Sequence, residues 1–172
     1  MITKDMINQL KADFENETKR REMSVSEMIE DIKKRHHEKE HIMMDKLLEK
    51  IKKYETEKQS INDAKLNGIF GTFRKMAVEL GAHFEKEELQ VFPRMLTAGD
   101  GDSELMLQIG ELENEHGKTE AYIADISKAS DYFKYRAEDE EIREIYKDME
   151  ILFSDISEHE GKENGELFPR FH

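Results

Sequence analysis

The sequence has no cysteine, no tryptophan and only two prolines. Without cysteine, the chain can offer no thiolate ligand to zinc or to an iron–sulfur cluster, and it has no cysteine nucleophile. No apolar run approaches the roughly twenty residues that a membrane-spanning helix needs, and Met1 to Leu10 lacks the apolar middle of a secretion signal. We therefore expect a cytoplasmic protein that does not bind membranes.

Charged residues are abundant, at 39% of the chain, and acidic residues outnumber basic ones to give a net charge of -13. Such a negative field repels phosphate backbones, so we expect no nucleic-acid partner. A length of 172 residues suits one domain with its own core, and the composition favours long amphipathic helices over sheets. Both a monomer and a homodimer are compatible with these features.

Apolar residues follow a helical period along most of the chain. Residues 1–23 carry a short stripe of Met6, Ile7, Leu10 and Phe14, which predicts an N-terminal helix or arm. Ser24 and Glu27 then form a capping-box pattern, which marks the start of a bundle domain over residues 24–172. Within it, apolar seams predict four helices, over about 24–57, from Asn62 to near Pro93, from Leu105 to Ile126, and from Ile142 to Pro169.

Four helices of similar length, each with one apolar seam and joined by modest loops, are typical of an all-α, up-down-up-down four-helix bundle. We expect the second helix to end near Pro93 and the fourth to end at Pro169, because proline disfavours helical geometry in the residue before it. No segment has the alternating pattern of a strand.

The chain contains an internal repeat. The twelve residues from His83 to Arg94 match those from His159 to Arg170 at six positions without a gap, at an offset of 76 residues. A weaker match relates His37 to His116 at an offset of 79 residues. The chain therefore consists of two helix pairs, each with one histidine followed by one His-x-x-x-Glu motif.

The repeated polar residues occupy seam positions where the helical pattern calls for leucine or isoleucine. They are His83, Glu87, His116, His159 and Glu163. Burial of unpaired imidazoles and carboxylates costs several kcal/mol, and we expect no buried lysine or arginine on the same seams. A pair of metal ions would compensate the carboxylates and use the imidazole lone pairs. The alternative is a metal-free interaction bundle with structural histidines.

The spacing suits a two-metal site, because residues four apart on a helix are neighbours and a glutamate can reach across to both ions. Mixed imidazole and carboxylate ligands favour iron, with manganese or zinc as poorer candidates, and leave room for a small ligand such as oxygen or nitric oxide. The first helix offers either His36 or His37, and we select His37. Glu120, one turn after His116, is expected to be solvated.

These residues resemble the hemerythrin-like (HHE cation-binding) family and, within it, the di-iron proteins for repair of iron centres. The resemblance rests on His36-His37, His83-x-x-x-Glu87 with Phe92-Pro93, Glu115-His116, and His159-x-x-x-Glu163-Asn164 with Phe168-Pro169-Arg170. It implies a bundle with a bridged pair of iron ions and assigns the first-helix ligand to His37. It also implies repair of iron–sulfur clusters damaged by nitric oxide or oxidative stress, through iron donation or nitric oxide handling, with damaged iron–sulfur proteins as partners.

Two departures from these relatives bear on function. Oxygen-carrying hemerythrins have a further histidine one turn after the third-helix ligand, where this chain has Glu120, which argues against simple oxygen carriage. The repair proteins usually also carry a cysteine-containing N-terminal domain, whereas this chain has residues 1–23 and no cysteine. The alternative function is binding or sensing of oxygen, nitric oxide or iron without catalysis.

Overall fold

The computed structural model describes residues 8–15, 23–58, 63–99 and 101–172, which form helices and no strand. The first long helix consists of α2 (Val25–Ile32), the π-helical turn η1 (Lys33–His37) and α3 (Glu38–Glu57). The second consists of α4 (Ala64–Lys86), the π-helical turn η2 (Glu87–Val91) and α5 (Phe92–Met95). The third is α6 (Ser103–Ala129), and the fourth consists of α7 (Glu140–Lys162), the π-helical turn η3 (Glu163–Leu167) and the 3-10 turn η4 (Phe168–Phe171).

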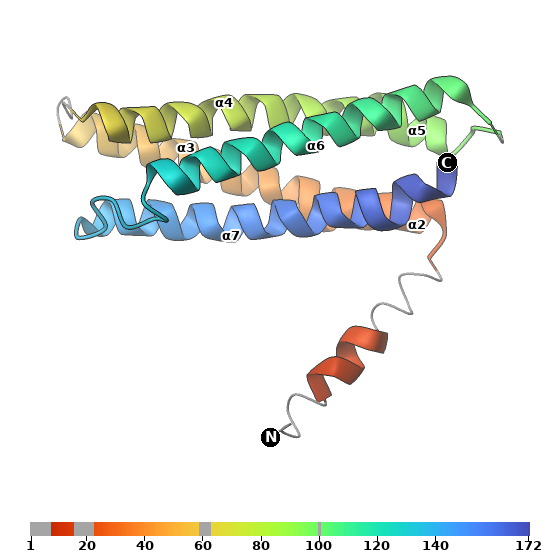
Figure 1. Cartoon of the computed structure of the whole chain (residues 1–172), viewed down its shortest axis with the longest axis horizontal. Helices are drawn as coiled ribbons and strands as arrows, with labels where there is room; N and C mark the ends of the chain where they lie inside the picture. Colours follow the sequence, from red (N-terminus) through yellow and green to blue (C-terminus); the bar gives the residue numbers. More distant parts are fainter. Residues whose placement is uncertain (1–7, 16–22, 59–62, 100) are drawn as a thin grey trace.

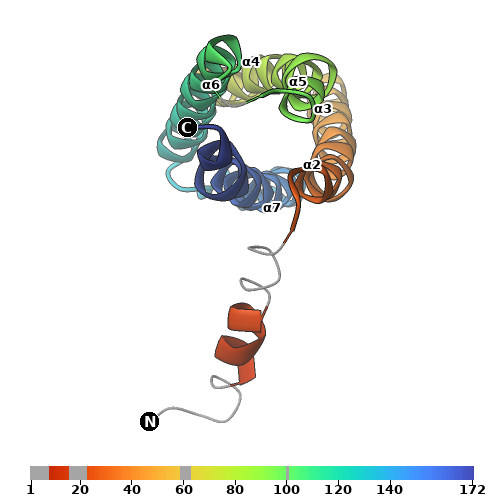
Figure 2. The same cartoon turned by 90° about the vertical axis from the view of Figure 1, so that its right-hand side faces the viewer.

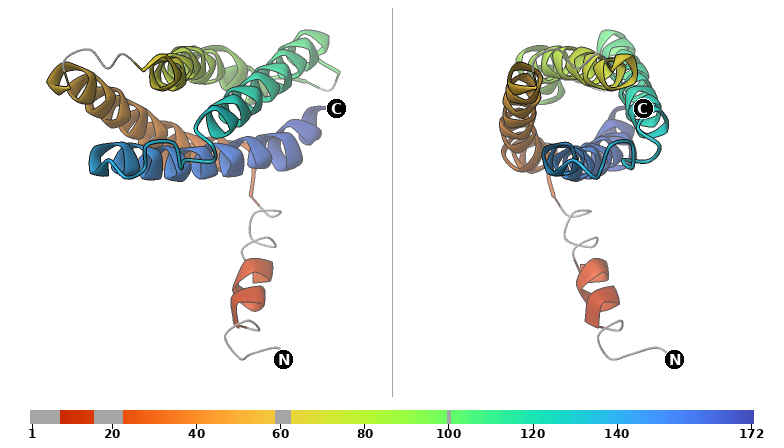
Figure 3. Two further views of the ribbon diagram at one scale, coloured as in Figure 1. Left: turned by 60° about the vertical axis from the view of Figure 1, so that its left-hand side comes forward. Right: turned by 90° about the vertical axis from the view of Figure 1, so that its left-hand side faces the viewer.

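Successive long helices run in opposite directions along a common axis (Figure 1). Viewed from either end they form a closed ring, in the order α3, α4, α6 and α7 (Figures 2 and 3). The most extensive packing is between α4 and α6 and between α3 and α7. The predicted all-α, up-down-up-down bundle is therefore confirmed. None of the helices in the described part of the chain is long and apolar enough to cross a bilayer.

Side-chain caps start the helices. The capping box predicted at Ser24 is present, since its hydroxyl accepts from the Glu27 N–H and the Glu27 carboxylate accepts from the Ser24 N–H. Aspartates cap the other three long helices without a reciprocal bond, since the side chains of Asp63, Asp102 and Asp139 each accept from a backbone N–H of the first turn. Each cap satisfies a backbone donor that the helix leaves without a partner.

The second helix ends near Pro93, as predicted, whereas the prediction that the fourth helix ends at Pro169 is wrong. The second continues through Pro93 to Met95, and the fourth continues through Pro169 as a 3-10 turn. In both, the residue before proline closes a π-helical turn, as the Phe92 N–H donates to the Glu87 carbonyl. Proline then lies in the first turn of a new short helix, where its missing N–H leaves no bond unmade.

The apolar core has two parts, one on each side of a polar layer. The larger part includes Met44, Leu47, Phe73, Leu80, Phe84, Met149 and Ile156. The smaller includes Ile29, Ile32, Val91, Phe92, Leu112, Leu167 and Phe168. Along every long helix, the predicted ligands fall between residues of the two parts. The bundle therefore surrounds its central polar residues with apolar side chains at both ends.

Residues 8–15 form a short helix whose side chains are all exposed, Leu10 and Phe14 among them. Met6 and Ile7, the other apolar residues of the predicted N-terminal stripe, lie outside the described residues. The division of the chain at residue 23 into an arm and a bundle stays a prediction.

Candidate metal centre

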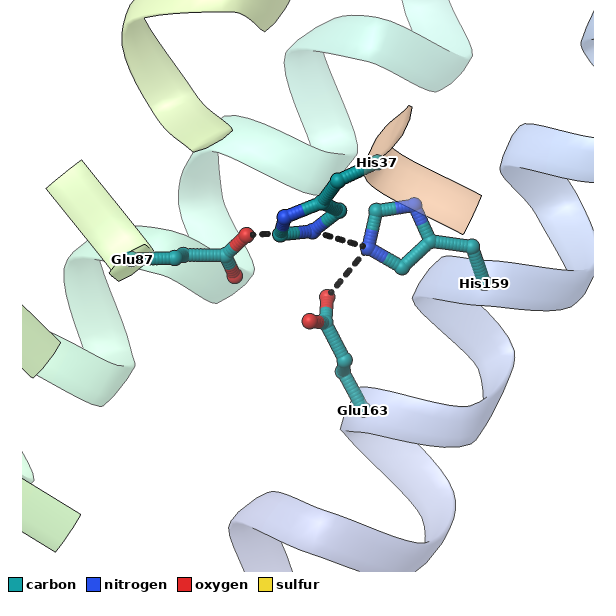
Figure 4. A group of neighbouring side chains, drawn as sticks. All are labelled: His37, Glu87, His159 and Glu163. Carbon is teal, nitrogen blue, oxygen red and sulfur yellow. Dashed lines mark hydrogen bonds and ion pairs between the residues drawn. The ribbon is translucent and has the colours of Figure 1, made fainter. Parts of the chain in front are cut away.

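Six buried side chains from the four long helices meet in the polar layer, and they form two groups that share both glutamates. One group contains His37, Glu87, His159 and Glu163, as drawn in Figure 4. The other contains His83, Glu87, His116 and Glu163. Within each group, one nitrogen or oxygen atom from every residue lies within 4.8 Å of the others. The structure thus brings together all six residues that the sequence singled out.

The imidazole Nε2 atoms point to the centre of each group. Those of His37 and His159 are 3.1 Å apart, and those of His83 and His116 are also 3.1 Å apart. Glu87 lies between the groups, with Oε2 3.3 Å from Nε2 of His37 and Oε1 3.3 Å from Nε2 of His83. Its carboxylate therefore faces one histidine of each group with a different oxygen.

Glu163 completes the centre from the opposite side. Its Oε2 atom lies 3.2 Å from Nε2 of His116 and 3.2 Å from Nε2 of His159. Because these two histidines belong to different groups, Glu163 also joins the groups.

Each imidazole turns its other nitrogen, Nδ1, to an oxygen acceptor outside the centre. The acceptors are Glu88 for His37 at 2.8 Å, Glu115 for His83 at 2.7 Å, Asn164 for His116 at 2.9 Å, and Glu40 for His159 at 3.2 Å. Nδ1 therefore carries the proton and donates it. This leaves the Nε2 lone pair free to bind a cation, and the outer bond fixes the orientation of the ring.

The π-helical turns coincide with the centre. His37 is the last residue of η1, while Glu87 and Glu163 are the first residues of η2 and η3. A π-helical turn contains one more residue than an α-helical turn, so it shifts the side chains that follow around the helix axis. These turns place a ligand and the adjoining apolar side chains on the same inward face.

The donor set fits cations. The carboxylate oxygens of Glu87 and Glu163 are buried without a hydrogen-bond partner, and such atoms carry a large desolvation penalty. Two lone pairs that face each other across 3.1 Å would repel unless a positive charge lay between them. Adjacent nitrogens on one ion are separated by about 3.0 Å when each bond is about 2.1 Å and the bonds are perpendicular. Both observations are consistent with bound metal.

The pKa values show the same attraction for positive charge. Burial lowers the pKa of His83, but the nearby Glu87 carboxylate, followed by Glu115, outweighs it and raises the value to about 9. Burial likewise lowers the pKa of His159, and Glu163 and Glu40 raise it well above its ordinary value. For Glu163, burial raises the pKa, while His159 and His116 hold it well below its ordinary value. Protons and metal ions therefore compete for this centre.

A comparison with family models matches residues 37–171 to the hemerythrin HHE cation binding domain. The chain belongs to the hemerythrin HHE cation-binding domain family. A comparison with curated proteins gave no match. Cation binding, which the family's description names, agrees with the two groups of histidine and glutamate side chains in this hemerythrin-like domain. The family predicted from the sequence is confirmed, whereas a closer relation to the repair proteins is not tested.

The other histidine of the first helix has different partners. His36 accepts a hydrogen bond at Nε2 from Lys162 at 2.7 Å, and its Nδ1 donates to Asp155 at 3.2 Å. Burial and the nearby Lys162 charge both lower the pKa of His36. His36 belongs to a third, separate group, with Glu40 and Asp155, and both of its nitrogens are engaged by Lys162 and Asp155. The structure thus places His37, rather than His36, at the centre.

Sequence analysis missed several buried polar residues beside the centre, namely Lys162, Glu40, Glu160 and Asp155. The expectation of no buried lysine on the seams is wrong, because Lys162 is buried against His36. Glu40, which accepts from His159, is fully buried, and burial raises its pKa. A signal for Glu40 existed, since it continues the apolar stripe of Met44 and Leu47. Glu120 is exposed, as expected.

Proposed function

We propose that the two groups hold a pair of iron ions and that the protein restores iron–sulfur clusters damaged by nitric oxide or oxidative stress. The observation that carries the proposal is the sharing of Glu87 and Glu163 between two groups that each contain two further imidazoles. A carboxylate that faces both groups suits two ions at the separation of about 3.5 to 4 Å that is usual in two-metal sites.

Iron is the metal that the ligands suit best. Four imidazoles and two carboxylates are too few to fill the coordination positions of two ions, and mixed nitrogen and oxygen donors with open positions favour iron over manganese and zinc. When bound, iron would supply a change of oxidation state and an open position for a small ligand such as oxygen or nitric oxide.

The residues around the centre hold its ligands and exclude water. His37 lies parallel to the ring of Phe84, with ring centres 4.2 Å apart, and His116 lies parallel to Phe168 at 5.9 Å. Outer hydrogen bonds fix the remaining rotation of each imidazole. A preorganised, water-poor site strengthens electrostatic interactions with bound cations.

The repair role is supported by the sequence resemblance to the proteins for repair of iron centres, carried by the two His-x-x-x-Glu motifs with their Phe-Pro-Arg extensions. Two routes are consistent with the centre. The protein donates an iron(II) ion to a damaged cluster, or it binds nitric oxide and so removes it from the cluster.

The test uses protein purified without oxygen and loaded with iron(II). Metal content per chain is measured first, and the protein is then incubated, with a thiol reductant, with an enzyme whose four-iron cluster nitric oxide has damaged. We expect the enzyme to regain activity with the native chain and not with the His83→Ala variant. Equal recovery with both proteins, or none with either, would contradict the repair role.

The burial of the ligands also favours a second candidate, reversible binding of oxygen or nitric oxide without catalysis, because exclusion of water protects a bound small ligand from side reactions. Absorption spectra that change when oxygen is added and return when it is removed would favour this candidate. Rapid, irreversible oxidation would favour repair.

A further inference from the structure

A pocket of about 360 Å³ lies between α4 and α6, and His83 forms part of its wall. Its other residues include Ala82, Lys86, Glu115, Lys118 and Thr119. His83 is 5% exposed, whereas the other five candidate ligands are 1% exposed or less. The group that contains His83 and His116 thus lies closer to solvent than the group that contains His37 and His159.

The internal repeat shows why the two groups differ. At the offset that relates His37 to His116, the counterpart of Glu40 is Thr119. Glu40 is fully buried and accepts from His159, whereas the shorter Thr119 forms part of the pocket wall. Beside the group of His37 and His159, the long Glu40 side chain therefore fills the space. Beside the group of His83 and His116, the shorter Thr119 leaves an opening.

The two lysines of the repeat also differ in how deeply they are buried. Lys162 is buried and donates to His36. Its counterpart Lys86 lies at the pocket, where it donates to Glu115 at 3.0 Å and to Glu111 at 2.9 Å. Glu115 also accepts from Nδ1 of His83 at 2.7 Å. At this pocket, His83 is covered by the side chains of Lys86 and Glu115. Hydrogen bonds hold these side chains in place, and both can rotate.

We propose that the metal ion held by His83 and His116 exchanges with solution through this pocket, whereas the ion held by His37 and His159 is retained. The Glu115 carboxylate, once it rotates away from His83, is an oxygen ligand for a hydrated divalent cation on its way in or out. No bond other than hydrogen bonds and metal–ligand bonds changes. This proposal rests on the proposed function in one respect, namely that both groups hold metal.

The test follows the release of iron(II) from fully loaded protein to an excess of a coloured chelator, without oxygen. We expect two phases of equal amplitude. Ala82→Phe places a bulky ring in the pocket at an exposed position and slows the fast phase at least tenfold, with the slow phase unchanged. Ala121→Phe, an exposed position on α6 away from the pocket, is the matched control and leaves both phases unchanged.

A second pair of variants tests the cover over His83. Lys86→Met removes the cation that holds Glu115 and accelerates the fast phase several-fold, whereas Lys46→Met, at an exposed position on α3, has no effect. After the fast phase, labelling of histidines followed by peptide mass spectrometry is expected to find His83 newly reactive and His37 still protected.

Release in one phase, or an Ala82→Phe variant that changes neither phase or both equally, would overturn this inference. The outcome is separable from the proposed function. Biphasic release from a protein that restores no cluster would refute repair alone, and monophasic release from a protein that restores clusters would refute only the exchange pathway.

Discussion

The Nε2 atoms of His37 and His159 lie 3.1 Å apart, although 122 positions separate these residues in the sequence. His83 and His116 form a second pair with the same separation. Each pair takes one histidine from each half of the internal repeat, so neither helix pair can build a complete group alone. The centre exists only when the whole bundle has closed.

The shared glutamates lead to the first prediction. Glu87→Gln and Glu163→Gln each replace a buried carboxylate that joins both groups by a neutral amide of similar shape. Because the amide brings no negative charge to offset the cations, we expect the metal content per chain to fall by at least half in either variant. Elemental analysis of protein purified without oxygen measures this content.

The control for this prediction is Glu120→Gln, which removes an exposed carboxylate one turn after His116. It is expected to retain the native metal content. Full metal content in both buried variants would show that the carboxylates are not ligands.

The neighbouring histidines of the first helix give the second prediction. His37→Ala removes an Nε2 atom that faces the centre and is expected to lower the metal content. His36→Ala is expected to keep the native metal content, because both nitrogens of His36 are bonded to Lys162 and Asp155. Metal content and the absorption spectrum of the iron-loaded variants measure the difference. The reverse result would assign the first-helix ligand to His36.

Most of the bundle could be predicted because local patterns encode it. The four apolar seams gave the number and order of the long helices, and Ser24 with Glu27 gave the start of the first one. Five of the six central residues could also be selected, since polar side chains on an apolar seam need a reason to be buried, whereas helical spacing leaves His36 and His37 open and the family resemblance assigns His37. The internal repeat supports the same selection, because each half of the chain contains one histidine and one His-x-x-x-Glu motif.

The π-helical turns could not be predicted in this way. Each begins or ends at a candidate ligand, yet the change from an i→i+4 to an i→i+5 backbone bond has no side-chain pattern of its own. For this reason the sequence pattern predicts a helix end at Pro169, although the helix continues to Phe171. Lys162 and Glu40 are buried because they contact His36 and His159 on other helices. The spacing of residues along one helix does not describe such contacts between helices.

Metal removal gives the third prediction. Each ion that binds only the folded state stabilises it by about 2.7 kcal/mol when the free metal is a hundredfold above its dissociation constant. For a domain of this length that is a rise of roughly 5 to 10 °C in the melting temperature for each bound ion. Melting curves of the native chain with iron(II) and with chelator measure the difference, and His83→Ala is expected to show a smaller one. Equal melting temperatures in the native chain would favour a metal-free interaction bundle.

The fourth prediction concerns Asp155 on α7, which lies outside the centre and accepts from His36 and Lys39. Burial raises the pKa of Asp155, but the hydrogen bonds from Lys39 and His36 outweigh this and hold the pKa below its ordinary value of 3.8. A carboxyl group whose pKa is lower in the folded state stabilises the fold above its unfolded-state pKa. That contribution is lost as the pH falls through the folded-state pKa.

Asp155→Asn is therefore expected to lower the free energy of unfolding by about 1 kcal/mol near pH 6, a modest value because Lys39 is half exposed. The difference from the native chain should shrink as the pH falls below 3.8. Urea unfolding of metal-free protein at several pH values measures it, and use of the metal-free form removes the pH dependence of metal binding. Asp148→Asn, which breaks a surface pair with Lys50, is the matched control and should change stability by a few tenths of a kcal/mol at most. A difference that stays constant down to pH 3 would show that the charge of Asp155 contributes nothing to the fold.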